Sequence, residues 1–224
     1  MRLVIFDFDD TLIDNTLLDM DSFRYVLDTF HLPQASYKTL IRWRKNGTIA
    51  KNIFRRIIKK KNNMLLEKCV SARLEYLARG GGGVKLANAK TGAKETLRQI
   101  KKNNNFIVVV SSRKDKSIIK KILKNLEMVQ YIDEIYCAED CKECLGKKFS
   151  ATNMKIKLYK LALSDFKFNS DEKPLAIGNL KSDIVAARKS NMIPIAISGS
   201  YRFDSGISKK ARTIKDLHEV LEIL

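Results

Sequence analysis

The sequence predicts an α/β protein, with a Rossmann-like core built on a parallel sheet and an all-helical domain inserted after the first strand. Two observations support this prediction. Short, almost continuously apolar stretches recur along the chain, as in strands buried on both faces of a sheet, and amphipathic stretches separate most of them. A long segment after the first of these strands has helical periodicity and contains no good strand. Such alternation of strands and helices is typical of a parallel sheet between layers of helices.

The elements of the predicted core follow one another at short spacing. Its strands are predicted over residues 3–6, 106–110, 133–137, 174–178 and 193–197. Its helices are predicted over residues 93–102, 116–126, 154–165 and 182–190. A hydrophobic content of 45% in 224 residues is ample for a buried core. We therefore expect one core domain formed by residues 1–14 and 86–224.

The inserted helical domain is predicted over residues 15–85. Pro33 and Gly47 interrupt its helical pattern, and the glycine run at residues 80–83 is too flexible to lie inside a helix. The segment contains 15 Lys and Arg against 5 Asp and Glu, so it carries about +10 of the formal net charge of +18. This charge raises nucleic acid as a partner, although a general bias toward Lys, Asn and Ile would produce the same excess.

Other features of the sequence bear on the compartment. The apolar run at the N-terminus is too short for a signal peptide, and no apolar stretch approaches membrane-spanning length. Four cysteines at mostly irregular spacing do not suggest a disulfide framework. We expect a soluble cytoplasmic protein with no membrane contact, and the sequence leaves its oligomeric state open.

The stretch VIFDFDDTLID places three carboxylates, Asp7, Asp9 and Asp10, directly after a buried strand. Like charges this close repel one another, and burial makes each harder to ionise, so a cation is expected to join them. Ligands of an open α/β sheet bind beyond the carboxyl ends of its strands. The polar residues that follow the other strands are Ser111, Ser112, Arg113, Lys114, Asn179 and Asp183.

These residues resemble the motifs of the haloacid dehalogenase superfamily of phosphotransferases. The first motif of that superfamily, DxDx(T/V), stands here as Asp7-Phe8-Asp9-Asp10-Thr11. A Ser after an apolar strand, a Lys-bearing helix and the sequence GNLKSD, where the family often has GDxxxD, follow in the expected order. The resemblance covers the whole chain. It places the helical insert where a cap domain stands in the phosphoglycolate phosphatase-like subclass.

The resemblance implies a phosphatase that forms an aspartyl-phosphate intermediate. Asp7 would attack phosphorus, and Asp9 would protonate the leaving oxygen and later take a proton from water. Ser111 and a lysine would bind the phosphoryl oxygens. Lys155 is the lysine that best matches the family's order, with Lys148 and Lys157 as alternatives. The residues expected to contact the substrate, a small phosphorylated metabolite, are Thr11, Ser112 and Arg113.

The resemblance also implies Mg²⁺ as the cofactor. Its ligands would be Asp7, the backbone carbonyl of Asp9, Asp183 and Asn179. Asn179 departs from the family pattern, which usually has Asp there, and its amide contributes no charge.

Three other functions remain open. A protein that kept the fold and lost turnover would bind phosphate or polyanions, and this is motivated by Asn179 and the basic insert. A phosphatase of the same family could act on nucleotide or nucleic-acid ends. Dehalogenases of the superfamily need no metal and lack acids near Asn179, but they typically also lack the second Asp of the first motif, which is present here as Asp9.

The three cysteines Cys137, Cys141 and Cys144 form a CxxxCxxC pattern. This spacing matches the iron–sulfur signature of radical enzymes that use S-adenosylmethionine, but those enzymes are built on a different barrel. A structural metal clip is a second interpretation. Inert thiols are the third, because Cys137 ends a predicted buried strand where a small hydrophobic residue is ordinary.

Overall fold

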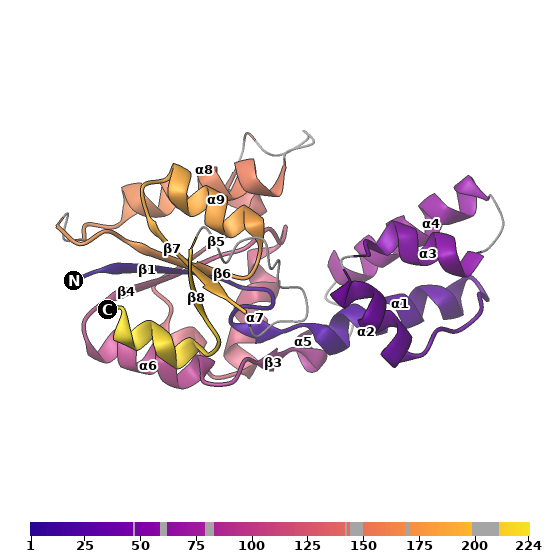
Figure 1. The fold of residues 1–224 in the computed structure, drawn as a ribbon, viewed down its shortest axis with the longest axis horizontal. Helices are drawn as coiled ribbons and strands as arrows, with labels where there is room; N and C mark the ends of the chain where they lie inside the picture. The colour runs from indigo at the N-terminus through magenta and orange to yellow at the C-terminus, as the bar shows by residue number, and fades with distance from the viewer. Residues whose placement is uncertain are drawn as a thin grey trace. The chain divides into compact units, whose positions relative to one another are not determined.

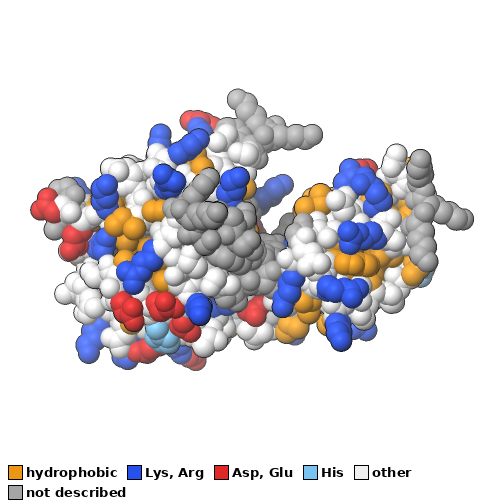
Figure 2. Space-filling model, viewed as in Figure 1, with side chains coloured by type: hydrophobic (Ala, Val, Ile, Leu, Met, Phe, Trp, Pro, Cys, Tyr) orange, Lys and Arg blue, Asp and Glu red, His pale blue; other side chains and the backbone are white. Residues whose placement is uncertain are grey.

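The computed structural model describes residues 1–224 except 47, 59–61, 79–82, 142, 144–149, 169–170 and 199–210. The chain divides into two compact units (Figure 1), one formed by Met1–Asp14 and Asn88–Leu224 and the other by Asn15–Ala87. Lys and Arg side chains occur on the surfaces of both units (Figure 2). No helix in the described part of the chain is long and apolar enough to span a membrane.

The larger unit is built on a parallel sheet. Within the described residues it has six strands in the order β5-β4-β1-β6-β7-β8. The strands are β1 (Leu3–Asp7), β4 (Phe106–Val110), β5 (Glu134–Tyr136), β6 (Leu175–Gly178), β7 (Ile193–Ile197) and β8 (Arg212–Ile214). Each neighbouring pair is parallel, and β1 pairs with β4 on one side and β6 on the other. The predicted α/β fold with a parallel sheet is confirmed.

Helices cover both faces of this sheet. Helices α8 (Ala151–Asp165) and α9 (Lys181–Lys189) lie on one face, while α6 (Ala93–Lys102) and the 3-10 helix Leu217–Glu222 lie on the other (Figure 1). All five residues of β1 are therefore buried. The unit also contains helix α7 (Lys116–Asn125) and the short 3-10 turns Val129–Tyr131 and Ala138–Asp140.

Helix α8 presents one buried face to the sheet. Its buried residues are Lys155, Leu158, Tyr159 and Ala162, which follow the i, i+3, i+4, i+7 pattern and so share one side of the helix. The helix begins at Ala151, three residues before the predicted start, because the Ser150 side chain caps it by accepting a hydrogen bond from the Asn153 N–H at 3.2 Å. Lys155 is thereby fixed in the second turn of a capped helix.

Strand β8 was missed in the sequence. It is a three-residue edge strand in which Arg212 and Thr213 are exposed and Ile214 is buried. Short edge strands with polar side chains lack the continuous apolar run by which the other strands were recognised. The missed strand lies three positions from β1 in the strand order, so the error does not affect the site at β1.

The secondary-structure elements of the smaller unit, in its described residues, are all helices. Its helices are α1 (Thr16–Thr29), α2 (Tyr37–Lys45), α3 (Ala50–Ile58), α4 (Asn63–Ala78) and α5 (Gly83–Leu86). The Phe23 and Phe54 rings pack in its core with their centroids 5.3 Å apart. Of the predicted interruptions, Gly47 and residues 80–82 lie outside the described residues, whereas Gly83 begins α5.

A buried charge cluster links three helices of the smaller unit. Asp19 on α1 pairs with Arg44 on α2, with a distance of 2.8 Å from Nε to Oδ2, and with Arg73 on α4. The Arg73 guanidinium also lies 4.5 Å from the centroid of the Phe23 ring. Arg44 and Arg73 therefore stabilise the contacts between helices inside this unit. The net charge of the unit is for this reason weaker evidence for a polyanionic partner.

A short antiparallel pair belongs to the larger unit where the chain leaves for the helices and returns. Strands β2 (Ile13–Asp14) and β3 (Asn88–Ala89) pair in the register Ile13 with Ala89 and Asp14 with Asn88. The Lys90 N–H adds a hydrogen bond to the Leu12 carbonyl at 2.9 Å. The two crossing segments are thus hydrogen-bonded to each other.

The substitution Gly92→Ala is expected to destabilise the larger unit. Gly92, before α6, has a φ of 76°, and a Cβ added there would lie 2.5 Å from His218 Cε1. The left-handed backbone and the overlap together should lower the free energy of unfolding by about 1–3 kcal/mol in urea denaturation. The double variant G92A/H218A should recover the part that is due to overlap. Full stability of G92A would contradict this account.

Candidate active site

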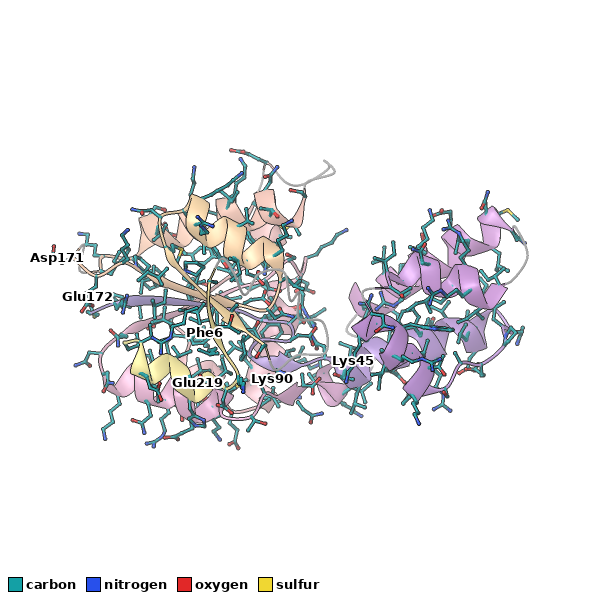
Figure 3. All side chains as sticks on the ribbon, viewed as in Figure 1. Phe6, Lys45, Lys90, Asp171, Glu172 and Glu219 are labelled. Atoms are coloured by element: carbon teal, nitrogen blue, oxygen red, sulfur yellow. The ribbon has the colours of Figure 1, made fainter. Side chains whose placement is uncertain are left out.

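Polar residues follow three neighbouring strands of the parallel sheet. Asp7 ends β1, Ser111 follows β4 and Asn179 follows β6, and all three are buried. Because the strands are parallel neighbours, their carboxyl ends meet at one edge of the sheet. Asp171 and Glu172 lie near the opposite edge, beside the amino-terminal end of β1 (Figure 3). Those two acids therefore play no part at this edge.

Lys155 joins two carboxylates that come from distant parts of the sequence. Its Nζ lies 2.5 Å from Asp7 Oδ1, and it also contacts Oδ1 of Asp183 on α9. The second oxygen of Asp183 accepts a hydrogen bond from the Leu180 N–H at 2.9 Å. Lys155 is 3% exposed, Asp7 4% and Asp183 not at all. Charges buried to this extent persist in proteins when they are paired and hydrogen-bonded, as these are.

One lysine does not balance this cluster. Burial raises the pKa of Asp7 to about 7; Lys155 works against this rise, whereas the charges of Asp183 and Asp9 add to it. Burial acts to lower the pKa of Lys155, but Asp183 and Asp7 together raise it above its usual range. The ammonium is thus firmly protonated, while the carboxylate form of Asp7 is disfavoured. A further cation at this position would stabilise the ionised Asp7.

Thr11 connects Asp7 to Asn179. Its Oγ1 lies 3.3 Å from Asp7 Oδ2 and 3.5 Å from Asn179 Oδ1. The intervening turn is tight, because the Leu12 N–H bonds to the Phe8 carbonyl at 3.1 Å. Thr11 was predicted to contact substrate, and the structure directs its hydroxyl to the carboxylate and amide beside it.

Asp9 is paired with Arg113, which follows β4. The Arg113 Nη2 lies 2.7 Å from Asp9 Oδ1, and the Arg113 backbone N–H donates to Ser111 Oγ at 3.2 Å. The neighbouring Ser112 is exposed. Arg113 was expected at the substrate, and sequence reasoning did not foresee its contact with Asp9. The signal that could have indicated it is the adjacency of β1 and β4, because a cation after one strand can reach a carboxylate after the next.

The oxygen atoms near Asp7 fit a hard divalent cation. Asp7 and Asp183 would offer carboxylate oxygens and Asn179 an amide oxygen, and these are ligand types that Mg²⁺ accepts. Burial raises the pKa of Asp7, so a nearby cation would stabilise its ionised form. In the described residues, no group of three His, Cys, Asp or Glu side chains could hold a metal ion. The set therefore depends on neutral oxygens for its remaining ligands.

Lys157 and Cys137 have contact partners outside the Asp7 cluster. Lys157 pairs with Glu143, and Lys148 is outside the described residues. The Cys137 thiol is buried, lies 3.9 Å from the Lys114 carbonyl, and has a pKa that burial raises to about 11. Cys141 is disulfide-bonded, so the expectation of inert thiols is wrong for this cysteine, and Cys144 lies outside the described residues.

Two residues near the cluster were missed. A Cβ added to Gly178 would lie 2.4 Å from the Cβ of Asp183, so glycine lets Asp183 approach β6. Tyr159 lies one turn after Lys155, is fully buried, and has a hydroxyl with no hydrogen-bond partner among the described residues. Burial raises its pKa, and the charge of Asp183 adds to the rise. Its spacing of four residues from Lys155 could have indicated that Tyr159 lies near the cluster. A tyrosine in an apolar helix is, however, more simply interpreted as a core residue.

Comparison with known proteins places these residues in a family. The family model of haloacid dehalogenase-like hydrolases matches residues 4–197. Comparison with curated protein sequences gives no match.

Solved structures share the fold over the full chain. A protein from Clostridium difficile that is provisionally named a phosphatase has a TM-score of 0.78 and 22% identity, with 100% of this chain and 98% of that chain covered. A haloacid dehalogenase-like family hydrolase from Streptococcus pneumoniae has a TM-score of 0.74 and 19% identity, with 100% and 98% covered. A protein from Haemophilus somnus provisionally named a phosphoglycolate phosphatase has a TM-score of 0.72 and 19% identity, with 100% and 97% covered.

At these identities the solved structures support the fold, and the family rests on the match to residues 4–197. That match spans the strand bearing Asp7, the helix bearing Lys155 and the helix bearing Asp183. The earlier resemblance is therefore confirmed: the chain belongs to the haloacid dehalogenase-like hydrolases.

Proposed function

We propose that this protein is a Mg²⁺-dependent phosphatase that hydrolyses a phosphomonoester of a small metabolite through an aspartyl-phosphate intermediate. The observation that carries the proposal is the buried cluster of Asp7, Lys155 and Asp183 at the carboxyl ends of neighbouring parallel strands. A nucleophilic carboxylate beside an ammonium suits attack on a phosphate ester, because the ammonium attracts the phosphoryl oxygens and stabilises their charge.

The chemistry divides between two carboxyl groups. An oxygen of Asp7 attacks phosphorus and the bond to the leaving oxygen breaks, while Asp9 gives that oxygen its proton. Water then attacks the phosphorus of the aspartyl phosphate and Asp9 takes a proton from it, which releases phosphate and restores Asp7. Ser111 and Lys155 bind the phosphoryl oxygens during both steps.

Asp7, Asp183, Asn179 and the Asp9 carbonyl would hold the Mg²⁺ ion. When bound, the ion supplies positive charge that offsets the negative charge of the phosphoryl group. The Thr11 hydroxyl lies between Asp7 and Asn179 and donates its one proton either to the Asp7 carboxylate or to the Asn179 amide oxygen.

The smaller helical unit, residues 15–87, is proposed to act as the cap that selects the leaving group. The names given to the structural neighbours, a phosphatase and a phosphoglycolate phosphatase, support a small phosphorylated substrate.

A panel of phosphate esters tests the proposal. Purified protein should release inorganic phosphate from p-nitrophenyl phosphate and from at least one member of a set of phosphorylated sugars, acids and nucleotides. Release should require Mg²⁺ and stop on addition of a chelator. Absence of hydrolysis across the panel, with phosphate still retained by the protein, would favour a binding protein that has lost turnover.

The substitution Asn179→Asp should tighten Mg²⁺ binding. Asn179 is fully buried beside Asp7, so a third carboxylate there adds an attractive charge for the ion. We expect the Mg²⁺ concentration for half-maximal activity to fall about tenfold, equivalent to about 1.4 kcal/mol. We also expect Mg²⁺ to raise the melting temperature more in the variant than in the wild type.

The control for this change is Asn103→Asp, which adds the same charge at an exposed position after α6. It should leave the Mg²⁺ dependence unchanged. Identical Mg²⁺ titrations of N179D and wild type would show that position 179 does not contribute to the metal site.

A further inference from the structure

The ion pair between Arg113 and Asp9 is partly buried and is formed by several short contacts, unlike a typical ion pair on the surface. Arg113 Nη2 lies 2.7 Å from Asp9 Oδ1, and Nε lies 3.1 Å from both Asp9 oxygens. The arginine side chain is 16% exposed and the aspartate side chain 25%. A fork of two nitrogens on one carboxylate fixes its orientation as well as its charge. Arg113 contacts both oxygens of the carboxylate, since Nε and Nη2 donate to Oδ1 and Nε also donates to Oδ2.

Arg113 is held in place independently of Asp9. Its backbone N–H donates to Ser111 Oγ at 3.2 Å, and its carbonyl accepts a hydrogen bond from the Ala138 N–H at 2.9 Å. Its guanidinium lies 5.3 Å from the centroid of the buried Phe8 ring. The backbone and the side chain of Arg113 are therefore restrained before the ion pair is counted.

Asp9 also stands on a restrained backbone. It forms a bridge with Ile13, and the Ile13 N–H bonds to the Phe8 carbonyl at 3.2 Å. Asp9 follows β1 and Arg113 follows β4, and these strands pair directly. The two residues thus come from adjacent strand ends, and the ion pair locks the side chain of Asp9 relative to both.

We propose that Arg113 is a positioning residue for Asp9: it fixes the orientation of the carboxyl group that exchanges protons with the substrate. This inference rests on the proposed phosphatase function. In the first step the Asp9 proton passes to the leaving oxygen as the bond between phosphorus and that oxygen breaks and the bond from Asp7 to phosphorus forms. Arg113 touches none of the reacting atoms and acts through Asp9.

This role predicts a dependence on the leaving group. An alkoxide is strongly basic, so its departure needs the proton from a well-placed acid, whereas p-nitrophenolate leaves with little help. The kinetic constant kcat/KM covers the steps up to release of the leaving group, which include this proton transfer. Loss of Arg113 should therefore impair alkyl phosphates far more than p-nitrophenyl phosphate.

The experiment compares kcat/KM for p-nitrophenyl phosphate and for the best alkyl phosphate of the wild-type panel. In Arg113→Gln we expect a loss of about 10- to 100-fold on the alkyl ester, a part of the 10²- to 10⁴-fold that general acids supply, and less than about threefold on the aryl ester. Arg113→Lys, which keeps the charge without the fork, should fall between. Arg98→Gln removes an exposed pair of the same kind with Glu95 on α6 and should match the wild type on both esters.

Equal losses on the two esters, or a rise in KM alone, would overturn the inference. Either result would indicate that Arg113 acts in packing or in substrate binding. A gain on the alkyl ester would also overturn it, because it would show that the arginine opposes protonation of Asp9. Absence of any Asp7-dependent hydrolysis of p-nitrophenyl phosphate by the wild type would overturn the proposed function itself, and with it this inference.

Discussion

Replacement of Asp7 by Asn is expected to abolish phosphate ester hydrolysis while the folded protein keeps or gains stability. The amide has nearly the same shape as the carboxyl group but cannot attack phosphorus, so turnover should fall by at least about 10⁴-fold. Asp171→Asn is the matched control, because Asp171 lies on an exposed loop near the amino-terminal end of β1 (Figure 3). It should leave hydrolysis unchanged, and substantial turnover by D7N would exclude Asp7 as the nucleophile.

The stability of D7N should depend on pH in a defined direction. The pKa of Asp7 is raised from 3.8 to about 7 in the folded protein, first by burial. The ionised carboxyl group therefore destabilises the folded state as pH rises above 3.8, and this effect is complete above about pH 7. In urea denaturation without Mg²⁺, the advantage of D7N over wild type should be largest near about pH 8 and vanish near about pH 4. A wild type more stable than D7N near about pH 8 would contradict this sign.

Replacement of Lys155 by Met is expected to abolish turnover and to destabilise the protein strongly. Methionine fills a similar volume but leaves Asp7 and Asp183 buried together without a cation. Removal of one partner from a buried ion pair typically costs about 3–5 kcal/mol, which urea denaturation near neutral pH would measure. The double variant K155M/D183N should recover part of this loss, because it also removes one of the two carboxylates.

The control for K155M is Lys101→Met, which breaks a partly exposed pair between α6 and Asp133 with a distance of 2.8 Å. Pairs of this kind contribute about 0–1 kcal/mol, so the control should remain close to wild type. A loss in K155M as small as in K101M would mean that the two carboxylates do not depend on Lys155 for their burial.

Much of the fold could be predicted because strands that are buried on both faces of a sheet consist of almost continuous apolar residues. β1 and β4 are continuous apolar runs, and their helices carry an apolar face. β8 could not be recognised, since two of its three residues are exposed at the edge of the sheet. Helix α8 was predicted to start too late, because its first turn is set by the Ser150 cap rather than by apolar spacing.

Residues of the site could be predicted where they belong to a sequence motif. Contacts between residues on different strands were harder to predict. Asp7 and Asp183 follow from their positions after β1 and β6, and Lys155 from its place in a helix. The partner of Arg113 could not be predicted, because it depends on which strands are neighbours. The same holds for Tyr159, whose buried hydroxyl is distinguished from an ordinary core position by three-dimensional proximity to Asp183.

The pairing of β2 with β3 has a consequence for how this architecture can diversify. Asp14 and Asn88, the last and first residues of the larger unit around the helices, are register partners, and such partners lie about 5 Å apart. An insertion whose ends coincide so closely adds little loop-closure entropy to the folding of the core, and each doubling of its length adds only about 0.6 kcal/mol. Residues 15–87 can therefore be exchanged as a module of different length and sequence, while the strands that carry Asp7, Ser111 and Asn179 keep their order.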